Sequence, residues 1–313
     1  MACIGDWNMK TNRKCIIKAD ATPKVLFLGN GILQLGHTNN SWEDLLKQIS
    51  NKKELPKLKN IVPYAMQPEV VCDCEVEEIQ RRISENIKEF PIHPYLQELL
   101  ELPFDAVITT NYTYEIEQVL SDGKWTKYKR KKAFTALNGE YKVNNNTFVC
   151  NVVETKSGKM IPVFHIHGES ERKHSMILSY YSYASALGRL ISHNSKLKNT
   201  LFEHQKSGMD YECKSWLEMF IMADVYSVGF GFDTSEFDVW WAIERKSREK
   251  AHHGKLTAYM ERKEECAQNY LFESMGVDNK IFEVVDGNYE PLYRYAINDI
   301  KTMLEEEMAN GNT

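Results

Sequence analysis

Short apolar runs alternate with stretches of helical periodicity along most of the chain. The run KVLFLG (24–29), for example, has the apolar character of strands that are buried on both faces of a parallel sheet. Alternation of such strands with helices is typical of an α/β fold. We predict a Rossmann-like, mostly parallel six-stranded sheet with helices on both faces, plus helical and hairpin insertions. The predicted strands are residues 24–29, 106–110, 161–168, 224–232, 255–260 and 280–285.

Two segments carry clear helix signals. Ser41 has the side chain of an N-cap residue, and Asp44 follows it three positions later, so a helix is predicted to begin there. Residues 76–90 are predicted to form another helix, because Ile79, Ile83 and Ile87 recur at helical spacing. Further helices are predicted at 93–102, 114–120, 177–191, 215–223, 236–250, 266–275 and 291–308.

The pattern changes at about residues 121–160, where polar, basic and Asn-rich segments replace the apolar runs. Asn138-Gly139 and Ser157-Gly158 are pairs typical of β-hairpin turns. We interpret this segment as an antiparallel insertion in the sheet. The chain shows no repeat and no low-complexity linker, so we predict a single domain over residues 1–313, with a core at about 24–290 and a C-terminal helix at about 291–308.

Composition and charge narrow the classes of partner. Hydrophobic residues make up 42% of the chain and charged residues 27%, the balance of a soluble globular protein. The formal charge of −5 and the pI near 6.0 disfavour direct nucleic-acid binding, since no global positive field attracts phosphates. One basic run, Lys124 to Lys132, is either a solvated loop or a docking surface for an acidic partner.

The cysteines and the apolar stretches indicate where in the cell the protein is expected. The seven cysteines are scattered, and the N-terminal residues lack the apolar segment of a signal peptide. Asp224 and several glycines interrupt the most apolar stretch, 219–232, so no membrane span is expected. We expect reduced thiols and a cytoplasmic location. Cys72 and Cys74 have no second pair at zinc-finger spacing, which disfavours a structural zinc site.

Glycines and compact polar residues follow four successive strands: GNG (29–31), TTNY (109–112), HIHG (165–168) and GFGFD (229–233). Ligands of such sheets bind at the carboxyl ends of the strands, near the point where the strand order reverses. Gly29 and Gly31 would permit close approach of a diphosphate, or only a tight turn after the strand. The G-x-G-x-x-G fingerprint is incomplete, and no acidic residue ends a second strand at the usual spacing, which disfavours an ordinary dehydrogenase.

Three side chains at these strand ends are candidates for chemistry. Asn111 either ties loop backbone together or faces a ligand. His165 and His167 stand one residue apart, so strand alternation predicts that both imidazoles point to the same face. Such a pair can bind a metal, relay a proton or form a polar end to a buried strand. Metal ligation needs further ligands, and none stands at nearby spacing, so no metal is expected.

The order of the segments GNGI (29–32), TTN (109–111), HIHG (165–168) and GFGFD (229–233) resembles that of the sirtuins. The chain is more similar still to the sirtuin-like NAD hydrolases of bacterial antiphage defence, over about residues 24–240. The resemblance implies that NAD is the substrate, and that Asn111 contacts the nicotinamide ribose and helps to position a water. It implies that His167 is a general base or orients the ribose hydroxyls, with His165 as a supporting residue. The implied NAD-binding residues are Gly29, Asn30, Gly31, Ile32, Thr110, Tyr112, Gly229, Gly231, Phe232 and Asp233, the last of which competes with a role as a helix N-cap.

Two features depart from the family pattern. Thr113 stands where these relatives usually have an aspartate after TTNY, so any ribose or nicotinamide contact from that position is lost or moved. The four-cysteine zinc module of protein-deacylating sirtuins is absent, and residues 121–160 occupy its place. This second difference weakens the interpretation as a peptide deacylase.

We therefore expect an NAD glycohydrolase that releases nicotinamide and ADP-ribose. Because nicotinamide leaves from a cationic state, the enzyme has mainly to stabilise an oxocarbenium-like ribose and deliver water, and a histidine with a pKa near 6.5 can accept the proton. The resemblance implies an abortive-infection effector, activated by assembly into a homo-oligomer or by a separate sensor subunit. The alternatives are an NAD-dependent deacylase or ADP-ribosyltransferase, and a non-catalytic sensor that binds NAD or ADP-ribose.

Overall fold

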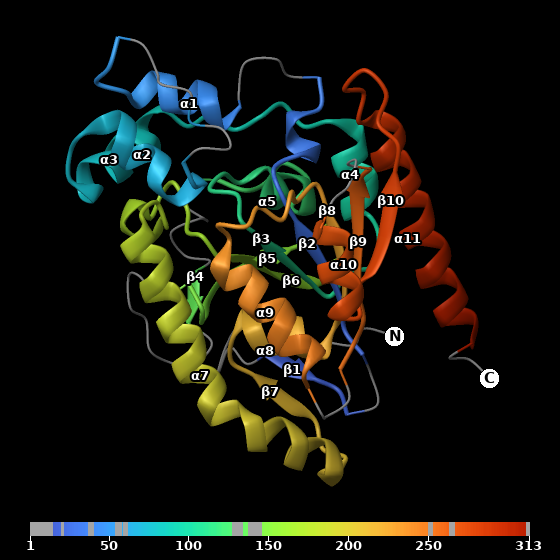
Figure 1. The fold of residues 1–313 in the computed structure, drawn as a ribbon. Coiled ribbons are helices and arrows are strands. Elements are labelled where there is room, and N and C mark those ends of the chain that lie inside the picture. The colour runs from blue at the N-terminus through green and yellow to red at the C-terminus, as the bar shows by residue number, and fades with distance from the viewer. Residues whose placement is uncertain are drawn as a thin grey trace.

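The computed structural model describes residues 15–19, 22–36, 41–53, 58, 62–126, 134–136, 146–249, 253–262 and 267–310. Within these residues, a large central sheet is covered by helices on both faces (Figure 1). The predicted α/β, Rossmann-like class is confirmed.

The described part of the central sheet has eight strands in the order β10-β9-β8-β2-β3-β6-β5-β4. The six strands from β10 to β6 run parallel, and they correspond to the six that the sequence predicts. They are β2 (Lys24–Leu28), β3 (Ala106–Thr109), β6 (Met160–His165), β8 (Asp224–Val228), β9 (Leu256–Glu261) and β10 (Asp278–Phe282). Two antiparallel strands, β5 (Val149–Glu154) and β4 (Phe134–Ala136), extend the sheet beyond β6. The predicted count of six was therefore too low, because the insertion joins the same sheet.

The strand order reverses beside β2. The chain first builds β2, β3 and β6 on one side, and then crosses to build β8, β9 and β10 on the other. β8 pairs with β2 in register from Lys24↔Asp224 to Leu28↔Val228. A crevice forms beyond the carboxyl ends of two strands at such a reversal, so this junction is the expected place for a ligand.

Burial on both faces explains the continuous apolar runs. Val25 and Phe27 of β2 pack into one hydrophobic cluster, and Leu26 and Leu28 pack into another on the opposite face. The first cluster includes side chains of α7 (Tyr180–Ser207), α8 (Trp216–Met222), α9 (Phe237–Ser247) and α10 (Ala267–Ser274). The second includes side chains of α4 (Pro94–Leu100), α5 (Glu115–Leu120) and α11 (Glu290–Asn310).

A helical insertion separates β2 from β3. It contains α1 (Trp42–Ile49), α2 (Gln67–Cys72) and α3 (Val76–Asn86), at the upper left of Figure 1. The insertion has its own apolar cluster, which includes Met176 and Leu178 from the segment after β6. α1 begins as predicted, since the Ser41 hydroxyl accepts the Asp44 N–H and the Asp44 carboxylate accepts the Ser41 N–H. α3 ends before the predicted Phe90, because the backbone is already extended at Ile87.

Short strands and turns test the remaining local predictions. β1 (Cys15–Ile17) and β7 (Tyr211–Cys213) form a separate antiparallel pair that is too short for a periodicity signal. The predicted turn at Ser157-Gly158 is confirmed, and joins β5 to β6 with Gly158 at a φ of +83°. The predicted turn at Asn138-Gly139 and residues 127–132 of the basic run lie outside the described residues. No helix in the described ranges has the length and apolar character needed to span a bilayer.

Candidate active site

A cavity of about 360 Å³ lies beyond the carboxyl ends of β2, β3, β6 and β8. Most of the predicted site residues line it, namely Asn30, Thr110, Asn111, Tyr112, His167, Gly229, Gly231, Phe232 and Asp233. The helical insertion contributes much of the remaining wall, including Trp42, Leu45, Tyr64, Ile87, Lys88 and Phe90. The volume is within the range of small-molecule sites, and the mixture of apolar walls with a few polar groups is typical of them.

Gly29, Gly31 and Ile32 are not among the cavity-lining residues. The Gly29 N–H donates to the Val228 carbonyl at 3.0 Å, and the Gly31 N–H donates to the Gly229 carbonyl at 2.8 Å. A Cβ on Gly29 would lie 2.3 Å from the Gly229 oxygen, so the two strand ends approach too closely for any side chain there. The expected contact of these amides with a diphosphate is thus replaced by a contact between β2 and β8. Ile32 is fully buried in the core.

Asn111 is held at the cavity by the end of β3. The Thr109 hydroxyl donates to the Leu28 carbonyl at 2.7 Å and accepts the Asn111 N–H at 3.1 Å. The Asn111 side-chain Nδ2 lies 3.4 Å from the Gly29 carbonyl, a long hydrogen bond. The carboxamide is therefore buried and weakly bonded while it faces the cavity, which leaves it able to bond a ligand.

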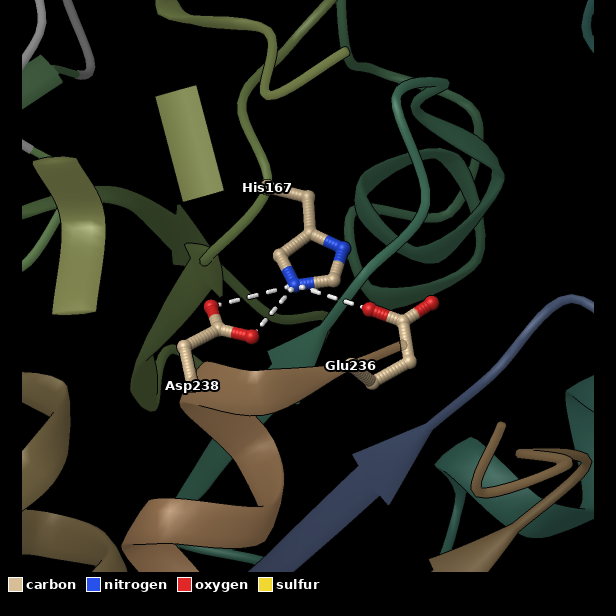
Figure 2. Close-up of side chains that lie close together, drawn as sticks. All are labelled: His167, Glu236 and Asp238. Carbon is tan, nitrogen blue, oxygen red and sulfur yellow. Dashed lines mark hydrogen bonds and ion pairs between the residues drawn. The ribbon is translucent and has the colours of Figure 1, made fainter. Parts of the chain in front are cut away.

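His167 lies against two carboxylates at the start of α9. Its Nε2 is 3.2 Å and 3.3 Å from the two oxygens of Asp238, and 3.5 Å from Oε2 of Glu236 (Figure 2). Burial lowers the pKa of His167, but the negative charges of Asp238 and Glu236 outweigh it and raise the pKa to about 9. The sequence-based expectation of a pKa near 6.5 is therefore wrong, because both carboxylates stand far along the chain from His167. An imidazole with this pKa is mostly protonated at neutral pH.

The same region of the chain matches a known family. The family profile described as SIR2-like domain matches residues 105–279, more than half of the chain. The chain belongs to the SIR2-like family. The matched range includes Asn111, His167 and both carboxylates, whereas the GNGI segment precedes it. Membership of the SIR2-like family supports an NAD-related function. No curated protein sequence matches the chain.

The two histidines of this SIR2-like domain face different sides of the sheet, contrary to the prediction that they share a face. β6 ends at His165, so strand alternation no longer applies to His167. His165 turns toward α5, where Nε2 lies 2.8 Å from Oε1 of Glu117, and its Nδ1 lies 2.6 Å from the Asn111 carbonyl oxygen. Burial lowers the pKa of His165, but Glu117 outweighs this and raises it to about 9. The geometry agrees with a supporting role for His165 behind Asn111.

A buried polar network continues behind His165. Asn151 of β5 donates from Nδ2 to Glu117 at 2.7 Å and to Glu169 at 3.0 Å. Glu169 in turn accepts from the Arg172 guanidinium at 2.6 Å. All of these side chains are buried, so the network ties the insertion strand β5 to the backbone that carries Asn111. No sequence signal indicated it, because its members are spread over four segments.

Asp233 and Thr113, the last two positions considered from the sequence, each have a hydrogen-bond partner within the protein. Oδ1 of Asp233 accepts from the N–H and the hydroxyl of Ser235, at 2.8 and 2.6 Å. Asp233 is therefore part of a local turn and is not the N-cap of α9, which is Glu236. Thr113 is buried at the cavity wall and bonds Glu115, a buried acid whose pKa burial raises to about 7. A carboxyl group thus lies close to the position where the relatives usually carry an aspartate.

His167, Glu236 and Asp238 also form the one group of three potential metal ligands in the described ranges, with ligand atoms within 4.8 Å of one another. A divalent ion that accepts imidazole and carboxylate ligands would fit such a set chemically. The same atoms equally form a histidine bonded to a carboxylate pair. The expectation that no metal is needed stays a prediction.

Proposed function

We propose that the protein is an NAD glycohydrolase, which hydrolyses the bond between nicotinamide and ribose. The observation that carries this proposal is the meeting of Asn111 and His167 in one cavity that also contains the carboxylate of Glu236. Cleavage of NAD develops positive charge on the ribose as neutral nicotinamide leaves. A buried negative group at the reacting centre stabilises that charge, since a preorganised charge acts strongly in a low-dielectric site.

In this mechanism the chain binds and orients the substrate. The Asn111 carboxamide bonds a ribose hydroxyl or the attacking water without adding a charge. His167 orients the ribose hydroxyls as a donor, since a mostly protonated imidazole is a poor base. Lys88 supplies a positive charge at the cavity wall for the diphosphate, in place of the amides of Gly29 and Gly31. The water attacks the ribosyl carbon as the carbon–nitrogen bond breaks, and the products are nicotinamide and ADP-ribose.

The experiment that tests this function is chromatography of nicotinamide and ADP-ribose after incubation of the purified protein with NAD. Wild type should release both products. The rate of release by Asn111→Ala and by His167→Ala should be at least about 100-fold lower than that of wild type. The exposed residues Asn298 and His253 provide matched control variants, Asn298→Ala and His253→Ala, which should keep the wild-type rate. Release that survives both site substitutions would show that the catalytic pair is wrong. NAD binding by calorimetry without any release would indicate a sensor.

We also propose that this activity serves antiphage defence by abortive infection, with activation by self-assembly or by a separate sensor subunit. The support is the resemblance of the four strand-end segments to the sirtuin-like defence hydrolases. Cells that express wild type should lose NAD upon phage challenge, whereas cells with His167→Ala should not. Light scattering of the purified protein, alone and with NAD, measures whether it forms a homo-oligomer. A monomer with full activity would contradict activation by assembly.

A further inference from the structure

The wall of the cavity at the start of α9 holds more negative charge than positive. Two carboxylates, Glu236 and Asp238, converge on the single imidazole of His167 (Figure 2). Among the described residues, neither carboxylate forms an ion pair with a lysine or an arginine. The side chain of Asp238 is 2% exposed and that of Glu236 15% exposed, so solvent screens them poorly. Even with His167 protonated, the cluster therefore keeps a net negative charge.

The two carboxylates have different surroundings. Asp238 is absent from the cavity lining, and its Oδ1 accepts the Val239 N–H at 3.0 Å while both of its oxygens face His167. Both oxygens of Asp238 are thus occupied by contacts within the protein. Glu236 lines the cavity, and its Oε2 accepts the Tyr183 hydroxyl at 3.0 Å. No hydrogen bond to its other oxygen, Oε1, occurs within the described part of the chain, so this oxygen is available to a ligand.

We propose that Glu236 is a catalytic residue that stabilises the cationic ribosyl centre and takes a proton from the attacking water, and that Asp238 is a positioning residue that orients the His167 ring. This inference rests on the proposed function. The bond from the ribosyl carbon to the nicotinamide nitrogen breaks, and its electron pair leaves with nicotinamide. The water oxygen bonds the same carbon, and its proton passes to Glu236 and then to solvent. His167 donates to a ribose hydroxyl throughout and gains no proton.

The assignment follows from the chemistry of the three groups. The Nε2 of His167 lies against the Asp238 carboxylate, whereas Oε1 of Glu236 accepts no hydrogen bond from the described residues and can take the proton of water. The groups beside His167 are Glu236 and Asp238 at the start of α9 and the Tyr183 ring of α7, whose centroid is 5.3 Å from that of the imidazole. Tyr112 lines the same cavity, and its hydroxyl donates to the Ile177 carbonyl at 3.1 Å. Burial raises the pKa of both phenols, so they stay neutral and leave Glu236 as the base. Burial also raises the pKa of Glu236, which brings this carboxyl closer to the value that suits a general base.

The test compares NAD hydrolysis by wild type, Glu236→Gln and Asp238→Asn between pH 5.5 and 9.5. The matched control is Glu244→Gln, because Glu244 lies on the same helix in a pair with Arg248 away from the cavity. Glu236→Gln should lower kcat at least about 100-fold, with an unchanged unfolding temperature and a Kd for NAD within about threefold of wild type. Asp238→Asn should retain activity at low pH and lose it at a lower pH than wild type does, since His167 loses its closest negative neighbour. Glu244→Gln should match wild type throughout.

Retention of wild-type kcat by Glu236→Gln would overturn the catalytic role. Activity that EDTA abolishes and Mn²⁺ restores would also overturn it, because the cluster would then be a metal site. If wild type releases no nicotinamide, the proposed function and the role of Glu236 fail together. The positioning role is read separately, by NMR titration of the His167 ring in wild type and Asp238→Asn. A fall of its pKa by more than about one unit in the variant supports that role, and an unchanged pKa refutes it.

Discussion

Substitution of Gly29 by alanine tests whether the fold requires a glycine at this position. A Cβ on Gly29 would meet three backbone atoms of the two residues that follow β8: the Gly229 oxygen at 2.3 Å, the Phe230 Cα at 2.5 Å and the Gly229 carbonyl carbon at 2.6 Å. Backbone atoms cannot rotate aside, so relief requires the ends of β2 and β8 to move apart. That movement would weaken the hydrogen bonds from Gly29 and Gly31 to β8 and its exit.

The clash and the weakened hydrogen bonds together set the expected change in the free energy of unfolding. Overpacking in a close-packed interior costs typically about 1–3 kcal/mol, and each of the two hydrogen bonds contributes about 1 kcal/mol net. We therefore expect Gly29→Ala to lower the free energy of unfolding by about 3–5 kcal/mol, a large share of a typical total of about 5–15 kcal/mol. Urea unfolding followed by tryptophan fluorescence measures this change.

Gly231 provides the matched control, because it lines the same cavity and a Cβ there meets no atom within 4 Å. Gly231→Ala should change the free energy of unfolding by no more than about 0.5 kcal/mol. A Gly29→Ala variant within about 1 kcal/mol of wild type would refute the steric argument. Equal destabilisation by both substitutions would refute it as well, since only one of them creates a clash.

Three further substitutions test the packing and the electrostatics. Lys246→Met removes the buried amino group that donates to three backbone carbonyls, and it should cost about 3 kcal/mol or more in a urea titration; an unchanged midpoint would contradict this. Ser41→Ala removes the capping box of α1 and should cost about 1 kcal/mol in the same assay, whereas a loss below about 0.3 kcal/mol would assign no role to the cap. Because the folded pKa of His165 is raised to about 9, its stabilising charge is complete below about pH 6.5 and is lost as the pH rises through 9. Glu117→Gln should therefore flatten the decline of the unfolding free energy over this range, and a decline as steep as that of wild type would refute the assignment.

The sheet could be predicted from the sequence because its strands are buried on both faces. Val25 to Leu28 are all apolar since each face of β2 meets a layer of helices, and this leaves a continuous signal. Asn111 and His167 were found for a related reason, as strand exits in an α/β sheet share one edge. β1 and β7 were missed because three-residue strands carry too little periodicity.

The charges of the site could not be predicted in the same way. Asp238 and Glu236 stand some seventy residues from His167, and only the packing of α9 beside the end of β6 brings them together. Without them, nothing near His167 in the sequence indicates a raised pKa. The prediction that His165 and His167 share a face was wrong because it assumed a continuous strand. The strand β6 ends at His165, so strand alternation does not extend to His167.

The place of β8 between β2 and β9 has a consequence for protein synthesis. β2 leaves the ribosome about two hundred residues before β8, its partner at the strand reversal, and both carboxylates follow β8. A nascent chain that ends before β8 contains Asn111 and His167 but lacks the opposite wall of the cavity, including Gly229 to Asp233. A product that is truncated before β8 therefore cannot form the complete site. Any activity of the cavity requires the pairing of β2 with β8, two strands that lie about two hundred residues apart in the chain.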